Sequence, residues 1–232
     1  MISRTRIKFC GLVRPSDVDV AVALGVDAVG FVFYERSPRA LSLDEAEPLR
    51  RRLPSWVSAV GLFVNAPAAH VRDARATLGL DVIQFHGDER AADCREAAGN
   101  GTWWRAVRMR GPSDLLESAA SFPDAEALLV DSFHTGYGGS GRAFDWSWIP
   151  EQRGRPLILS GGLDPTTVGQ AIEQVLPDAV DVSSGIQAGD PRSKDHRKME
   201  TFVAEVLRVD ALRAQTLTDL DRSHRSLTRS QP

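Results

Sequence analysis

A cysteine stands beside a glycine near the start of the chain, in the segment IKFCGLVR at residues 7–14. A thiolate can abstract a proton, and a carboxylic acid can donate one. Asp131, at the end of the apolar run ALLVDS, is the matching acid candidate. Cys10 and Asp131 could therefore form an acid–base pair if the fold brings these two strand ends together. For Cys10 the alternative is a small, packed core residue, which is the commonest role of a free cysteine.

A thiol with an ordinary pKa is only a few per cent ionised at neutral pH, so Cys10 would need a nearby positive charge. Strand alternation places Lys8 on the same face as Cys10. If that face is buried, the charge of Lys8 needs a partner, and Asp181 in the run AVDVSSG is a plausible one. The pair could favour the thiolate or could be structural only, and the sequence leaves both options open.

Two glycine-containing segments and one arginine could bind acidic groups. LSGGL at residues 159–163 and VSSGI at 182–186 both follow apolar runs. Backbone N–H groups in such turns can converge on a phosphate. Arg39, in the segment after the second run, could hold a carboxylate through two parallel hydrogen bonds. The alternatives are ordinary glycine turns and a solvated loop charge.

Short apolar runs recur along the chain and are separated by segments with helix signals. Their spacing, about 21 to 30 residues, is that of strand–helix units, and several runs are apolar on both faces, as covered parallel strands require. We therefore predict an α/β fold with a single (β/α)8 TIM barrel, in which the active site lies at the C-terminal ends of the strands. A doubly wound open sheet is the alternative. The eight runs begin near residues 7, 28, 57, 81, 103, 127, 157 and 179.

Three helix signals support this pattern. Ser42 and Glu45 have the spacing of a capping box, and Asp164 before a proline is a predicted N-cap. The segment DHRKMETFVAEVL places an apolar stripe, ending at Leu207, on one side of a helix. Beyond it the composition becomes polar, so we predict a barrel domain over residues 1–209 and a short C-terminal tail, partly helical or disordered, over 210–232.

Bulk composition excludes several classes of function. The chain has 232 residues, 28 Lys and Arg against 31 Asp and Glu, and a formal net charge of −3, so no basic field indicates nucleic-acid binding. No apolar run approaches the roughly 20 residues needed to span a bilayer, and the N-terminus has no signal-peptide core. With only two cysteines, we expect a cytoplasmic protein without a disulfide framework, and a monomer.

Other conspicuous residues receive less specific interpretations. His86 in QFHGDE could be catalytic, but a lone histidine after a strand is more often a hydrogen-bonded structural residue. Arg36 is interpreted as a solvated charge and Cys94 as a helix core residue. The glycine-rich segment at 136–146 is interpreted as a mobile lid. No zinc-ligand spacing, P-loop or dinucleotide fingerprint is present.

Taken together and in order, these motifs resemble the phosphoribosylanthranilate isomerase family of tryptophan biosynthesis. The resemblance covers about residues 5–207. Its most specific part is the combination of the lysine–cysteine–glycine motif with VGFVFYERSPR, QFHGDE, GGSGRAFDW and VDVSSG. Departures from the usual pattern are Phe9, Val13, Phe85 and Asp164, none of which removes a catalytic group.

The resemblance implies a (β/α)8 barrel and an Amadori rearrangement of a small phosphorylated substrate, without cofactor or metal. It implies Cys10 as the general base, Asp131 as the general acid and Arg39 as the anthranilate-binding residue. It places the phosphate at Gly161, Gly162, Ser184 and Gly185. The competing interpretations are the related histidine-pathway isomerase, which would have an aspartate in place of Cys10, and a barrel that binds a phosphorylated ligand without catalysis.

Overall fold

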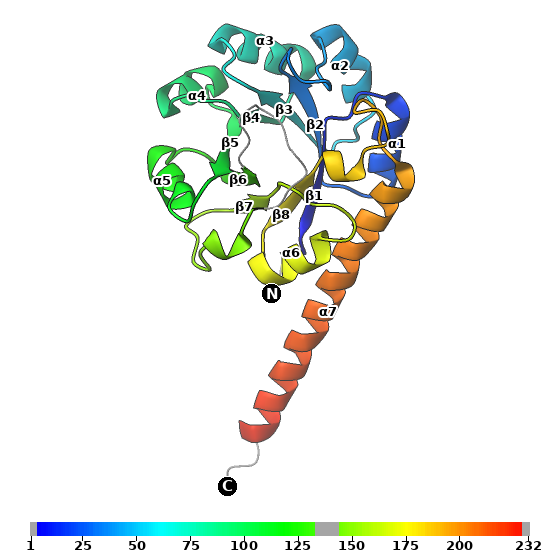
Figure 1. Cartoon of the computed structure of the whole chain (residues 1–232), viewed down its shortest axis with the longest axis vertical. Helices are drawn as coiled ribbons and strands as arrows, with labels where there is room; N and C mark the ends of the chain where they lie inside the picture. The colour runs from blue at the N-terminus through cyan, green and yellow to red at the C-terminus, as the bar shows by residue number, and fades with distance from the viewer. Residues whose placement is uncertain (1–3, 133–143, 229–232) are drawn as a thin grey trace.

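The eight apolar runs form one closed parallel barrel in the computed structural model, which describes residues 4–132 and 144–228, with side chains up to residue 216 (Figure 1). Each strand pairs with its neighbour in sequence, and β1 closes the ring by pairing with β8. The TIM-barrel prediction is confirmed and the open-sheet alternative is wrong, because an open sheet would leave β1 and β8 as edges. The strands are β1 Arg6–Cys10, β2 Ala28–Phe33, β3 Ser58–Phe63, β4 Val82–Phe85, β5 Thr102–Met109, β6 Ala127–Ser132, β7 Leu157–Leu159 and β8 Ala179–Val182.

Helices surround the barrel and cover the outer faces of its strands (Figure 1). Every residue of β2 and of β6 is buried, as a parallel sheet covered on both faces requires. Between β6 and β7 the described residues contain only a short 3-10 helix, where a full helix was expected. The helices are α1 Pro15–Ala23, α2 Leu43–Arg50, α3 Ala68–Leu78, α4 Ala91–Ala98, α5 Asp114–Ser121, α6 Val168–Val175 and α7 His196–Thr228, with 3-10 helices η1 Trp146–Trp148 and η2 Ser184–Ile186.

The helix ends follow the capping residues in the sequence. Ser42 and Glu45 form the predicted capping box of α2. The carboxylate of Asp164 accepts hydrogen bonds from the N–H groups of Thr166 and Thr167, so it caps the turn that leads into α6, although the regular helix begins only at Val168.

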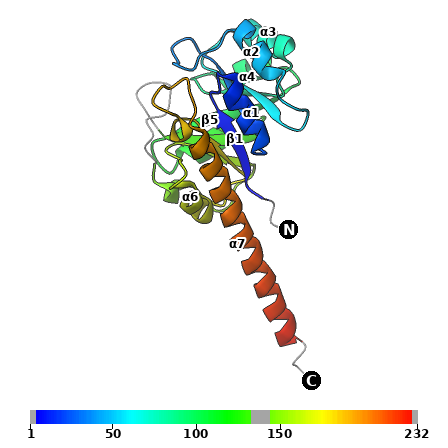
Figure 2. The same ribbon diagram turned by 90° about the vertical axis from the view of Figure 1, so that its right-hand side faces the viewer.

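The last helix extends beyond residue 209, where the sequence predicts that the barrel domain ends. α7 packs Met199, Phe202, Val206 and Val209 into the core and then continues away from the barrel to Thr228 (Figure 2). The predicted boundary at residue 209 therefore falls inside a continuous helix, and the division into barrel and tail stays a prediction. Leu207 does not belong to the buried stripe as expected, because its position on the helix turns it to solvent, where it is 52% exposed.

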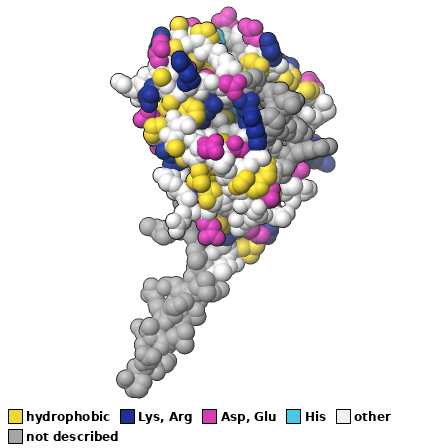
Figure 3. All heavy atoms as spheres, turned by 60° about the vertical axis from the view of Figure 1, so that its left-hand side comes forward, with side chains coloured by type: hydrophobic (Ala, Val, Ile, Leu, Met, Phe, Trp, Pro, Cys, Tyr) yellow, Lys and Arg dark blue, Asp and Glu magenta, His cyan; other side chains and the backbone are white. Residues whose placement is uncertain are grey.

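Acidic, basic and hydrophobic side chains are interspersed on the barrel face seen in Figure 3. None of the helices in the described part of the chain combines the length and the apolar character that crossing a bilayer requires.

Candidate active site

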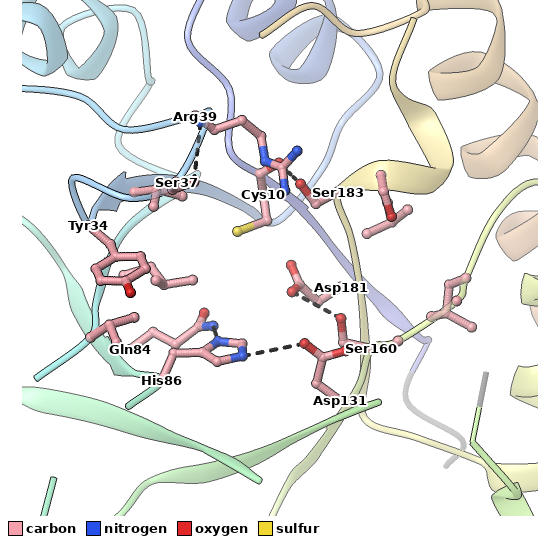
Figure 4. A pocket seen from close by; sticks show the side chains of 18 residues that line it. Cys10, Tyr34, Ser37, Arg39, Gln84, His86, Asp131, Ser160, Asp181 and Ser183 are labelled. Carbon is pink, nitrogen blue, oxygen red and sulfur yellow. Dashed lines mark hydrogen bonds and ion pairs between the residues drawn. The ribbon is translucent and has the colours of Figure 1, made fainter. Parts of the chain in front are cut away.

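A cavity opens at the C-terminal ends of the barrel strands, where the chain places most of its candidate site residues (Figure 4). Residues from β1, β2, β3, β4, β6, β7 and β8, or from the loops that follow them, contribute to its wall. The lining comprises Cys10, Val32, Tyr34, Ser37, Arg39, Leu62, Val64, Gln84, His86, Asp131, Ser160, Gly161, Gly162, Leu163, Asp181, Val182, Ser183 and Ser184. The structure thus brings Cys10, Asp131, Arg39 and most of the glycine-loop residues to one cavity.

Cys10 ends β1 with its side chain inside the barrel. It is 5% exposed and pairs in register with Gly30 of β2. A Cβ at Gly30 would lie 2.8 Å from the Cys10 sulfur and 3.2 Å from Lys8 Nζ, so the glycine makes room for both groups. Burial raises the pKa of the Cys10 thiol, while the ammonium of Lys8 acts in the opposite direction. The resting thiol is therefore neutral but lies beside a cation that favours its ionised form.

Lys8 forms the ion pair suggested by the sequence. Its Nζ donates to Asp181 Oδ1 at 2.7 Å, and both side chains are buried. Burial alone would lower the pKa of Lys8, but Asp181 and the Cys10 thiol outweigh that effect, so the pKa is raised and the lysine stays charged. Ser160 donates to the other carboxylate oxygen of Asp181 at 3.4 Å.

Asp131 is the second-last residue of β6 and faces His86 (Figure 4). Its Oδ2 lies 3.4 Å from His86 Nε2, and its Oδ1 accepts a hydrogen bond from the N–H of Ser132 at 2.7 Å. The other ring nitrogen of His86 contacts the amide nitrogen of Gln84 at 3.1 Å. Asp131 is therefore oriented by two neighbours, and one of them can exchange a proton with it.

Two residues near the fourth strand were not recognised as part of the site from sequence. His86, interpreted as structural, lines the cavity and contacts the candidate acid. Gln84 is a fully buried polar residue in β4. Its signal was present in the sequence, because a glutamine inside the apolar run VIQF must point toward a polar interior or a ligand.

Arg39 reaches the cavity from the loop after β2. Its Nη1 donates to Gln187 Oε1 at 3.4 Å, which orients the guanidinium. A Cβ at Gly11, where φ is +68°, would lie 2.6 Å from Arg39 Cδ. The glycine after the candidate base therefore allows the arginine side chain to cross the backbone next to it. Arg36 is exposed, in agreement with its interpretation as a solvated charge.

The two glycine segments meet on the opposite side of the cavity from the loop after β4. Gly161 and Gly162 have φ values of +85° and +72°, which favour glycine. A Cβ at Gly185 would lie 1.9 Å from the carbonyl oxygen of Leu163, so the loops after β7 and β8 are in direct contact. Ser184 lies at the start of η2 and lines the cavity. Because of this contact, backbone groups of both loops face the same part of the cavity.

The described residues contain no group of three or more His, Cys, Asp or Glu side chains that could hold a metal ion. Cys94 is buried in α4, as expected. The predicted lid at 136–146 lies mostly outside the described residues. Its described end includes Asp145, which accepts a hydrogen bond from the N–H of Ser147 and caps η1.

Comparison with known proteins identifies the family of this chain. The family model for N-(5′-phosphoribosyl)anthranilate isomerase matches residues 7–205. The chain belongs to this family. The isomerase of Dechloromonas aromatica (strain RCB) is 51% identical over 207 residues, which cover 89% of this chain and 98% of that protein.

Two solved structures of phosphoribosylanthranilate isomerase superpose on this barrel. Each is 37% identical to this chain, has a TM-score of 0.78, and covers 87% of this chain and 98% of its own. One is a complex with reduced 1-(o-carboxyphenylamino)-1-deoxyribulose 5-phosphate. The other describes monomers generated from the dimeric enzyme of Thermotoga maritima. The resemblance drawn from the sequence motifs is thus confirmed over most of the chain.

Proposed function

We propose that this protein isomerises N-(5′-phosphoribosyl)anthranilate to 1-(2-carboxyphenylamino)-1-deoxyribulose 5-phosphate in tryptophan biosynthesis, with Cys10 as general base and Asp131 as general acid. The observation that carries this assignment is the placement of both groups on the wall of one cavity, although β1 and β6 are distant in sequence. Membership of the isomerase family supports the same reaction.

The first step is ring opening. Asp131 in its acid form donates a proton to the ring oxygen of the ribose, and the bond between that oxygen and C1′ breaks with its electron pair left on oxygen. The lone pair of the anthranilate nitrogen forms a C1′=N double bond, so the open form is an iminium. His86, 3.4 Å from Asp131 Oδ2, is the neighbour that can return a proton to the carboxylate.

The second step moves a proton from C2′. The iminium makes this proton acidic. The Cys10 thiol, which is neutral at rest, first releases its proton to solvent, and the thiolate then accepts the C2′ proton. The electrons of the C2′–H bond form a C1′=C2′ double bond and neutralise the nitrogen, which gives an enolamine. Loss of the proton from the C2′ hydroxyl and protonation of C1′ then produce the ketose. Lys8 favours the thiolate in this step, against the cost of its burial.

Substrate binding uses one arginine and the backbone of two loops at the cavity. Arg39 supplies a planar guanidinium for the anthranilate carboxylate, because two parallel N–H donors match the two carboxylate oxygens. The backbone of Gly161 and Gly162 in one loop, and of Ser184 and Gly185 in the other, supplies donors for the phosphate. These contacts to the two negatively charged groups would hold the ribose near Cys10 and Asp131.

The deciding experiment measures turnover of the substrate by loss of anthranilate fluorescence in wild type, Cys10→Ser and Asp131→Asn. Each substitution should lower kcat by at least about a hundredfold, since acid–base groups contribute about 10² to 10⁴ in rate. Cys94→Ala is the matched control, because it removes a buried thiol far from the cavity and should leave kcat unchanged apart from lower stability.

Three results would contradict parts of the assignment. Full activity of Cys10→Ser would remove the thiol from the mechanism, and full activity of Asp131→Asn would remove the carboxyl group. A folded wild type without turnover would favour a binding barrel or the related histidine-pathway substrate. The cytoplasmic location and the monomeric state stay predictions, and the oligomeric state can be measured by light scattering of the purified protein.

A further inference from the structure

Lys194 is a buried lysine that the mechanism above does not use. It is 3% exposed, and its main chain forms an isolated bridge with Gln187 in the segment that follows η2. Its Nζ donates to the carbonyl of Ser183 at 2.9 Å and to the hydroxyl of the same residue at 3.3 Å. The Ser183 hydroxyl in turn donates to the carbonyl of Cys10 at 2.9 Å. One chain of hydrogen bonds therefore links this ammonium to the main chain of the candidate base.

The main chain of Lys194 is anchored to α1, which explains how a lysine is held in the interior. Its N–H donates to Asp17 Oδ2 at 3.1 Å, and its carbonyl accepts from Arg14 Nη2 at 3.1 Å. Asp17 is fully buried and also contacts Arg14 and His196. The side chain of Lys194 is thus directed toward Ser183 by a network outside the cavity.

The charged groups around Lys194 come from several elements. Arg39 in the loop after β2 disfavours its charge, while Cys10, Asp181 and Asp17 favour it. Burial, with the contribution of Arg39, lowers the pKa of Lys194 to about 8, so the lysine still carries its charge over most of the neutral range. At Cys10, the charges of Lys8 and Lys194 both oppose the rise in thiol pKa that burial causes, whereas Asp181 adds to that rise.

We infer that Lys194 is a positioning residue for the base: its buried ammonium holds the Ser183 turn against Cys10 and adds positive charge that favours the Cys10 thiolate. This inference rests on the proposed role of Cys10 in the reaction. The two lysines then affect Cys10 from different places. Lys8 lies inside the barrel, and Lys194 acts through Ser183, the residue that follows β8.

The test measures the ionisation of Cys10 without substrate. The rate of alkylation by iodoacetamide is followed as a function of pH, and mass spectrometry of the Cys10 peptide separates it from Cys94, whose pKa burial raises to about 12. In Lys194→Met the thiol pKa should rise by about one unit, so alkylation at a given neutral pH should slow about tenfold. The ascending limb of kcat/KM against pH should move in the same direction.

Three further variants separate charge from structure. Lys194→Gln keeps hydrogen-bond donors but no charge, so it should shift the thiol pKa upward even if Lys194→Met fails to fold. Lys194→Arg keeps the charge and should restore most of the alkylation rate. Lys198→Met is the matched control, because Lys198 Nζ also donates to a carbonyl of the loop after β8, that of Gln187 at 3.2 Å, but from the exposed surface. It should leave the profile unchanged.

The inference about Lys194 and the proposed function can fail independently of each other. If folded Lys194→Gln or Lys194→Met has the wild-type alkylation profile, the inference is overturned, whatever its turnover. An equal shift in Lys198→Met would also overturn it, since a general loosening of the loop would then explain the effect. If the wild type does not convert the substrate at all, the proposed function fails even when the thiol pKa responds to Lys194.

Discussion

Lys8 Nζ lies 2.7 Å from Asp181 Oδ1 across the seam where β1 and β8 close the barrel. The two residues are register partners, so closure of the barrel itself brings the charges together. Because both side chains are buried, neither charge can be left without the other. The pair therefore connects the stability of the barrel with the ionisation of Cys10, which lies beside Lys8 on the same strand.

Removal of Lys8 should affect stability and catalysis in separable ways. Lys8→Met leaves Asp181 buried without its partner, which should lower the free energy of unfolding by about 3–5 kcal/mol. The double variant Lys8→Met/Asp181→Leu should recover much of that loss, because no buried charge remains, yet its kcat should stay low. Urea denaturation and turnover assays on both variants measure the two effects. Recovery of kcat in the double variant would show that Lys8 does not tune the base.

A methyl group at position 30 should disturb the base directly. In Gly30→Ala the new Cβ would lie 2.8 Å from the Cys10 sulfur, so the thiol must move. We expect kcat/KM to fall by about a hundredfold, the effect of an approximately 1 Å misplacement of a reacting group. Gly154→Ala is the control, since nothing lies within 4 Å of its added Cβ. Equal activities for the two variants would argue against a close fit around Cys10.

The contact between the two glycine loops should control binding of the phosphate. Gly185→Ala places a Cβ 1.9 Å from the carbonyl oxygen of Leu163 and must push the loops apart. We expect KM to rise at least about tenfold, because this is the effect of losing roughly one hydrogen bond to a charged group. The change in kcat should be smaller. Gly189→Ala, in the same loop with nothing within 4 Å of its Cβ, should keep the wild-type KM. A KM that does not change in Gly185→Ala would place the phosphate elsewhere.

The contribution of Asp17 to the free energy of unfolding should depend on pH. Burial opposes its charge, but hydrogen bonds from Arg14, His196 and the N–H of Lys194 outweigh that effect, so the pKa of Asp17 is lowered. A carboxyl group whose pKa is lowered by folding stabilises the fold at pH values above its pKa in the unfolded chain. This stabilisation is lost as the pH falls through the pKa of the group in the folded protein. Asp17→Asn should therefore cost about 3 kcal/mol at neutral pH and less below about pH 4.

Asp19 provides the comparison for Asp17 on the same helix. It pairs with Arg52 at 2.7 Å, but both side chains are exposed. Asp19→Asn should cost no more than about 1 kcal/mol, as expected for a surface ion pair. Urea titrations of both variants between pH 3 and pH 7 give the comparison. A pH-independent difference between Asp17→Asn and wild type would show that the charge of Asp17 does not stabilise the fold.

The sequence by itself determined where the strands lie and that they are parallel and covered by helices, while the closed barrel was implied by the resemblance and decided by the pairing of β1 with β8. Apolar runs such as AVGFVF and ALLVDS are buried on both faces, and this pattern distinguishes covered parallel strands from amphipathic ones. Local chemistry also determined the cap at Ser42, because the capping box depends only on Ser42 and Glu45, which are close in the chain. Strand alternation was enough to suggest that Lys8 and Cys10 share a face.

Only the tertiary structure decided which distant groups meet. The contact of His86 with Asp131, and the hydrogen bonds from Lys194 through Ser183 to Cys10, join elements whose separation in sequence carries no local signal. Closure of the barrel sets these contacts, since it places the ends of β1, β4, β6 and β8 around one cavity. The length of α7 was also missed, because its polar composition after residue 210 resembles a tail although the backbone continues as a helix.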